Sequence, residues 1–185
     1  LCSMVFYMPL SSYYPLMSSG YFAVSAQYAS VVEVLYAAGM MAAAGLLGAK
    51  GNLKNPLRAS VLGALLVGVT AFIGGVLPPT RRGFWVFAAA CGLMGAAGNL
   101  YGIPITAYMQ RTIAPEKLGR VFSLMGSAMS AAMPLGLLIS GPVAEKGGVA
   151  LWFRVTGAAV SVICVAVLAI LPRLPEKKER LDAEA

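Results

Sequence analysis

Long apolar runs constrain this chain of 185 residues more than any other feature. A helix needs roughly 20 apolar residues to cross a hydrocarbon core about 30 Å thick. Runs near or above this length are Leu1–Met17, Ala23–Ala49, Leu57–Leu77, Phe84–Tyr108, Val121–Val143 and Val149–Leu171. The pattern predicts an all-α membrane protein with six transmembrane helices, followed by a polar tail over residues 173–185.

The composition agrees with a membrane environment. The chain is 59% hydrophobic and only 11% charged, whereas soluble domains carry about 25% charged residues. It opens at Leu1, with no basic stretch before an apolar run. We therefore expect no signal peptide and a chain that is part of something longer, with residues 1–172 forming one helical bundle.

Glycine, serine and proline mark the expected breaks between these runs. Ser18-Ser19-Gly20 is expected to end the first run, Pro78-Pro79 the third, and Gly147-Gly148 to precede the last. Proline stops a helix because it lacks an amide proton and fixes φ.

The distribution of basic residues predicts the orientation in the membrane. If the chain crosses the membrane at each run, ten Lys and Arg residues fall on one side and four on the other. The four are Arg81, Arg82, Lys146 and Arg154. Cytoplasmic loops are the more basic ones, so the C-terminus is expected in the cytoplasm. Because the basic residues lie between apolar runs, we expect lipid rather than nucleic acid as their partner.

The residues available for chemistry exclude several kinds of site. The chain has no His, and Cys2, Cys91 and Cys164 are isolated within apolar segments. Isolated cysteines of this kind are usually small packing residues. We expect no metal, no cofactor and no enzymatic activity, because no nucleophile is paired with a base.

Aromatic pairs lie near the ends of several runs. Phe84-Trp85, Trp152-Phe153 and Tyr21-Phe22 all fall on the less basic side of the predicted membrane. This position is typical of an interfacial aromatic belt.

Glu33 is the one acidic residue well inside an apolar run. It lies about ten residues into the second run, near the membrane midplane at about 1.5 Å per residue. A charged side chain at that depth is costly, so Glu33 should face a cavity or a partner, or be protonated. It is our candidate proton-coupling residue. The alternative is a buried hydrogen bond that fixes helix packing.

Polar side chains within the runs could line a cavity. The substrate-cavity candidates are Tyr13, Tyr14, Gln27, Asn99 and Tyr101. Asn99 needs hydrogen-bond partners if it is buried. Interhelical hydrogen bonds are the alternative role for this set.

The loop between the fourth and fifth runs is a candidate gating segment. Pro115 and Glu116 suit the first turn of a helix. Gln110, Gly119 and Arg120 are the candidate gating residues, and Arg120 could pair with an acid or with helix carbonyls. The alternative for Arg120 is a charge that extends to the membrane surface and fixes orientation.

This loop resembles the major facilitator superfamily. The segment with Pro104, Gln110, Pro115, Gly119-Arg120-Val121 and Ser123 is similar to the connection between helices ten and eleven in its macrolide-efflux and enterobactin-exporter branch. Gly141-Pro142-Val143-Ala144 with Gly147 is similar to the end of helix eleven in that branch. Residues 48–54 stand at the loop between helices eight and nine, but lack the acidic residue of the fuller loop motif.

The resemblance implies helices seven to twelve of a twelve-helix transporter that works by alternating access in the plasma membrane. It implies proton-driven efflux of drug-like or amphiphilic small molecules, with an N-terminal six-helix half as partner. A channel, or a structural or interaction module without active transport, is the alternative. Rings of repeated polar residues, which would favour a channel, are not evident.

Overall fold

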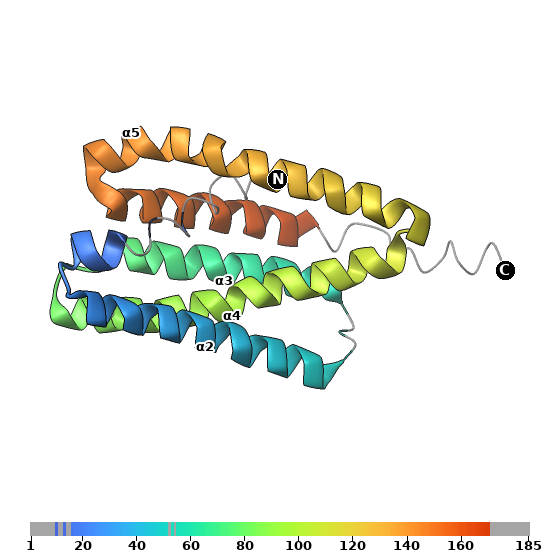
Figure 1. Ribbon diagram of the computed structural model, residues 1–185, viewed down its shortest axis with the longest axis horizontal. Coiled ribbons are helices and arrows are strands. Elements are labelled where there is room, and N and C mark those ends of the chain that lie inside the picture. Colours follow the sequence, from blue (N-terminus) through green and yellow to red (C-terminus); the bar gives the residue numbers. More distant parts are fainter. Residues whose placement is uncertain (1–9, 11–12, 14–15, 52, 54, 171–185) are drawn as a thin grey trace.

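The computed structural model describes residues 10, 13, 16–51, 53 and 55–170, and over these residues the protein is a bundle of long helices (Figure 1). A short π-helix, η1 (Met17–Tyr21), precedes α2 (Ala26–Lys50), α3 (Pro56–Val76), α4 (Arg81–Thr112) and α5 (Pro115–Ile170). The helices α2 to α5 are long and apolar enough to cross a membrane. Most of the first predicted run and all of the tail at 173–185 lie outside the described residues.

The long helix α5 consists of two arms that fold back on each other (Figure 1). Gly148 lies between them with φ 75° and ψ 165°, outside the helical region. A positive φ favours glycine because a Cβ would be strained there. We call residues 115–147 the first arm and residues 149–170 the second arm. The predicted break at Gly147-Gly148 is confirmed.

Local sequence signals explain where the other helices begin and end. The Thr80 hydroxyl accepts a 3.1 Å hydrogen bond from the Gly83 amide and caps α4, directly after the two prolines. Pro56 occupies the first turn of α3, where a missing amide proton costs nothing. Pro115 and Glu116 begin α5 as expected.

The expected break at Ser18-Ser19-Gly20 is wrong. The chain continues through these residues as the π-helical turn η1, and the amide of Phe22 donates to the Met17 carbonyl over 3.0 Å. The reversal comes later, at Ala23, which has a φ of 49°. Met17 and Ser18 are buried, and such packing overrides the weak helix propensity of serine and glycine.

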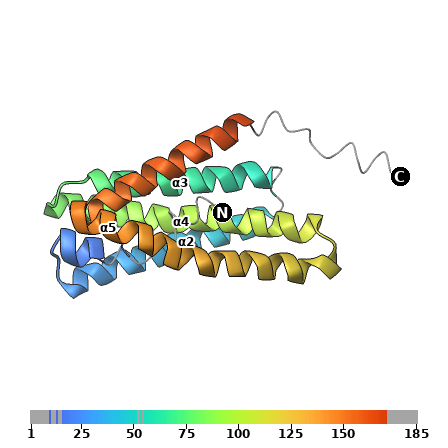
Figure 2. The same cartoon turned by 90° about the horizontal axis from the view of Figure 1, so that it is seen from above.

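The packing order of the helices differs from their order in the sequence. The helix α3 packs against both α4 and α5, whereas α2 packs mainly against α4. Figure 2 shows the second arm of α5 running diagonally beside α3. The helices α2 and α3 are consecutive, yet in the described part of the chain they do not pack extensively on each other. Therefore α2 is an edge helix with α4 as its main neighbour.

Small residues allow α2 and α4 to approach closely. A Cβ at Gly39 would overlap the carbonyl oxygen of Gly92, and a Cβ at Gly95 would overlap the carbonyl oxygen of Tyr36. Helix association in lipid depends on such close backbone contact, because hydrophobic burial supplies little driving force there.

Three of the six side chains in the predicted aromatic belt are instead buried core, so the expectation is wrong for them. Phe84, Trp152 and Phe153 are each only 1% exposed. Phe87 joins them, with its ring centroid 6.0 Å from that of Phe153. Trp85 remains exposed. Residue order alone could not separate the inward face of a helix end from its outward face.

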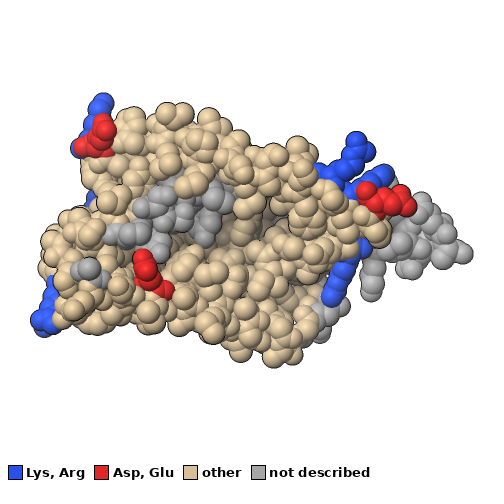
Figure 3. Space-filling model, viewed as in Figure 1, with Lys and Arg blue, Asp and Glu red and all other residues tan. Residues whose placement is uncertain are grey.

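Charged side chains gather at the two ends of the bundle (Figure 3). The long middle of the visible face is almost entirely uncharged, as expected of a surface that contacts hydrocarbon.

Candidate functional site

Glu33 is exposed on α2, but it lies nearer to one end of the helix than predicted. The helix begins at Ala26 rather than Ala23. Glu33 is therefore about 10 Å along a helix about 37 Å long. Glu33 thus lies in the first third of α2, and its depth in the membrane stays a prediction.

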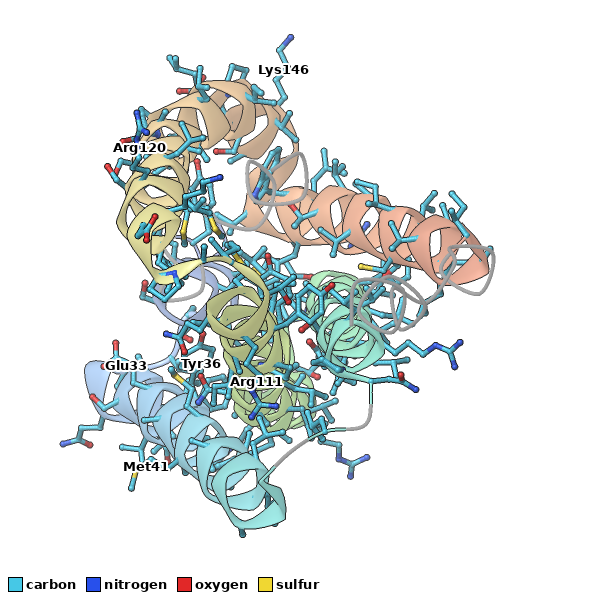
Figure 4. The ribbon with its side chains drawn as sticks, turned by 90° about the vertical axis from the view of Figure 1, so that its right-hand side faces the viewer. Glu33, Tyr36, Met41, Arg111, Arg120 and Lys146 are labelled. Atoms are coloured by element: carbon cyan, nitrogen blue, oxygen red, sulfur yellow. The ribbon has the colours of Figure 1, made fainter. Side chains whose placement is uncertain are left out.

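The side chain of Glu33 points away from the packed face of α2. Val32 is fully buried, and Leu35 and Tyr36 pack against the core. Figure 4 shows Glu33 at the outer edge of α2 and Tyr36 on the side nearer to α4. Within this chain, Glu33 thus lies on an open surface rather than in a closed core.

Asn99 joins α4 to α2. Its side-chain Nδ2 donates a 2.7 Å hydrogen bond to the backbone carbonyl of Met40. The interhelical role that we considered for the polar residues is therefore present at Asn99. Tyr101 is half-buried and lies near Cys164 of the second arm of α5. Residues two apart point to nearly opposite sides of a helix, so Asn99 and Tyr101 do not share one cavity wall.

Tyr13 contacts the first arm of α5. Its hydroxyl lies 3.0 Å from Oγ of Ser140, within hydrogen-bond distance. Ser140 is fully buried, and this contact gives its hydroxyl a partner from Tyr13. Gln27 is exposed at the start of α2. Tyr14 lies outside the described residues.

The three candidate gating residues are on the surface. Gln110 lies in the last turns of α4, and Gly119 and Arg120 lie in the first turns of α5. Figure 4 shows Arg120 at the edge of the bundle on α5, apart from Arg111 at the end of α4. Their role in gating stays a prediction.

Arg154 and Arg111 have structural roles that the sequence did not indicate. Arg154, expected only to set orientation, donates from Nε to the carbonyl of Gly75 over 2.6 Å. It joins the second arm of α5 to the last turn of α3. Arg111 lines a cavity of about 370 Å³ at the other end of the bundle, together with Pro104, Ala107 and Tyr108. The spacing of these four residues places them on one face of α4, which is a signal that helical periodicity could have revealed.

Comparison with known sequences adds independent evidence. A sequence profile described as Major Facilitator Superfamily matches residues 1–185. Macrolide efflux protein A of Streptococcus pyogenes is 38% identical over 165 residues, covering 89% of this chain and 40% of that protein. Macrolide efflux protein A of Enterococcus faecalis is 39% identical over 134 residues, covering 72% of this chain and 41% of that protein.

A third relative comes from another group of bacteria. The multidrug efflux pump Tap of Mycolicibacterium fortuitum is 36% identical over 140 residues, covering 71% of this chain and 32% of that protein. No solved structure matches the chain at a significant level. The chain thus spans about two fifths of the length of the macrolide efflux proteins that it matches.

Proposed function

Because the chain belongs to the Major Facilitator Superfamily, in its macrolide-efflux-like branch, we propose that it is the C-terminal half of a drug efflux transporter. The observation that carries this proposal is the similarity to efflux proteins over most of the chain. Long apolar helices make it a multi-pass membrane protein. Residues 1–172 form helices seven to twelve, residues 173–185 form a tail on the cytoplasmic side, and the cell membrane is the site of action.

An N-terminal six-helix half is the proposed partner. Apolar side chains are exposed on α2 and on the first arm of α5. They support the proposed partner because they form an apolar surface that a second half can cover. Val34 and Met41 on α2, and Leu124 and Leu138 on α5, are each more than 65% exposed. Some of this surface contacts lipid, and the remainder is available to the other half. Transport then proceeds by alternating access, in which the two halves rock about a central substrate cavity.

Glu33 is the proposed proton-coupling group. It is exposed on α2, in the first third of the helix. An acidic side chain within a membrane span is costly unless it faces a partner or a water-filled cavity. In the complete transporter the N-terminal half supplies that environment, and protonation of the carboxylate favours one orientation of the two halves. Gln27 and Tyr13 contribute to the substrate cavity from the same half.

The test is efflux by the complete transporter in inverted membrane vesicles. A macrolide and an unrelated amphiphilic dye serve as substrates, and the proton gradient is imposed and then collapsed with a protonophore. We expect saturable uptake into the vesicles that stops when the gradient collapses. Uptake that persists without a gradient would contradict proton coupling, and non-saturable flux would favour a channel.

A further inference from the structure

Pro104 divides α4 into two parts. Proline has no amide proton, so the carbonyl of Leu100, four residues earlier, cannot receive its helical hydrogen bond. We propose that residues 105–112 of α4 take up two orientations about Pro104, and that a hydrogen bond from the Ser60 hydroxyl to the Leu100 carbonyl stabilises the second. The inference concerns the movement of one helix, so it goes beyond the efflux function and holds for any substrate or coupling ion.

The peptide group that carries this carbonyl lies at the contact between α3 and α4. A Cβ at Gly63 would overlap both the carbonyl carbon of Leu100 and the amide nitrogen of Tyr101. Glycine at position 63 therefore lets the backbone of α4 lie directly against α3. The acceptor that Pro104 leaves without a helical partner is inside the bundle, at this contact.

Ser60 supplies a donor on the same side of α3. It precedes Gly63 by about one helical turn and is only 3% exposed. Among the residues that the structure describes, its hydroxyl has no hydrogen-bond partner. A buried hydroxyl without a partner has lost its hydration with no compensation, so an orientation of α4 that offers an acceptor gains stability.

The antiparallel course of the two helices brings the donor and the acceptor to the same level. Gly63 lies against Tyr101, whereas Gly74, later in α3, lies against Phe87, earlier in α4. Ser60 is therefore level with the residues that follow Tyr101. Helical carbonyls point toward the residue four positions later, so the carbonyl that precedes the proline points toward this level too.

The two parts of α4 also differ in burial. Before the proline, Met94 and Ala97 are buried, whereas none of residues 105–112 is. The hydroxyl of Thr112 donates to the Tyr108 carbonyl over 2.8 Å, a bond that stays within this last part. Because helices kink at proline, residues 105–112 can tilt with less loss of packing than the part before. Such a tilt displaces the start of the connection to α5.

The distance between two spin labels tests the inference. Labels at Leu62→Cys on α3 and Gln110→Cys on α4, both exposed positions, report where the last turns of α4 lie. The sample is the complete transporter in lipid nanodiscs, with its accessible cysteines replaced. Double electron–electron resonance should resolve two distance populations. Ser60→Ala should reduce the second about two- to tenfold relative to the first, the range for one hydrogen bond. Ser130→Ala, an exposed serine on α5, should leave the ratio unchanged.

A second variant tests the proline. Pro104→Ala restores the amide proton, so the Leu100 carbonyl gains its helical bond and only the first population should remain. Ser60→Ala should then have no further effect on the measured distances. Pro134→Ala, an exposed proline within α5, should leave both populations in place. Circular dichroism shows that each variant keeps its helices, and the Ser60→Ala result decides alone if Pro104→Ala does not fold.

Three outcomes would overturn the inference. They are a single distance population in the parent, equal effects of Ser60→Ala and Ser130→Ala, and an undiminished effect of Ser60→Ala in the Pro104→Ala background. None of these measurements uses efflux, so each outcome leaves the proposed function to its own test.

Discussion

Asn99 Nδ2 donates a 2.7 Å hydrogen bond to the carbonyl of Met40, so that a side chain of α4 holds the backbone of α2. Asn99→Ala removes this bond. We expect a loss of about 0.5–2 kcal/mol in the free energy of unfolding, the range for hydrogen bonds between membrane helices. Titration of the purified chain with a denaturing detergent measures it. Asn55→Ala is the matched control, because Asn55 makes no side-chain capping bond; equal effects of the two variants would contradict the role of Asn99.

Close approach of α2 and α4 depends on glycine at position 39. In Gly39→Ala the new methyl group overlaps the Gly92 carbonyl, so the helices must separate. We expect destabilisation by about 1–3 kcal/mol, as for overpacking. Gly45→Ala on the same helix meets nothing within 4 Å and should stabilise by up to about 1 kcal/mol through helix propensity. The same detergent titration tests both, and a neutral Gly39→Ala would show that this interface is looser than described.

Arg154 joins the second arm of α5 to α3 through the Gly75 carbonyl. Arg154→Gln loses this bond, and we expect unfolding to become easier by about 1–3 kcal/mol, because bonds to charged donors are stronger than neutral ones. Arg82→Gln changes the same charge at an exposed position and should leave stability within about 0.5 kcal/mol of the parent. If Arg154→Gln were as neutral as Arg82→Gln, Arg154 would be an orientation charge only.

Glu33 should be required for proton coupling and not for folding. In the complete transporter we expect Glu33→Gln to abolish gradient-driven efflux while the amount of protein in the membrane stays unchanged. Glu145→Gln is the control, since Glu145 is also exposed but lies beside Lys146 near the turn of α5. Vesicle uptake across a range of external pH distinguishes the two. Unchanged rates and unchanged pH dependence in Glu33→Gln would remove this residue from the mechanism.

The proposed orientation predicts opposite labelling of two lysines. Lys117 and Lys146 are both exposed, at the start and end of the first arm of α5. In a Cys2→Ala background, Lys146→Cys should react with an impermeant maleimide added to intact cells, and Lys117→Cys only after permeabilisation. Cys91 and Cys164 are buried and should react slowly in both conditions. The reverse pattern would invert the topology.

Hydropathy and loop residues predicted most of the helices. A membrane span must form its backbone hydrogen bonds within the helix, and it appears in the sequence as a long apolar run. Thus α2, α3 and the break at Gly148 lie within a few residues of expectation. Which way a side chain faces was less predictable. Trp152 and Phe153 were expected at the membrane interface and are core residues. The position of Glu33 along its helix shifted because α2 begins after the reversal at Ala23, a turn that no proline or glycine signals.

The candidate site was only partly predictable for a related reason. Asn99 and Tyr101 are close in sequence, but Asn99 bonds to α2 and Tyr101 lies near Cys164 of α5, because residues two apart point to nearly opposite sides of α4. The packing of α4 on α2 depends on close glycine contacts between helices that are not consecutive. The residue type at a single position does not specify which helix it packs against. The family match, in contrast, covers the whole chain.

The preference of α2 for α4 over α3 has a consequence for biogenesis. Spans leave the ribosome in order, so α2 enters the bilayer before the helix against which it packs has been made. Until α4 arrives, the face of α2 around Gly39 and the carbonyl that Asn99 will engage are open to lipid or to chaperones. Assembly of this bundle therefore has a waiting step, and a slowed translation of α4 would prolong it.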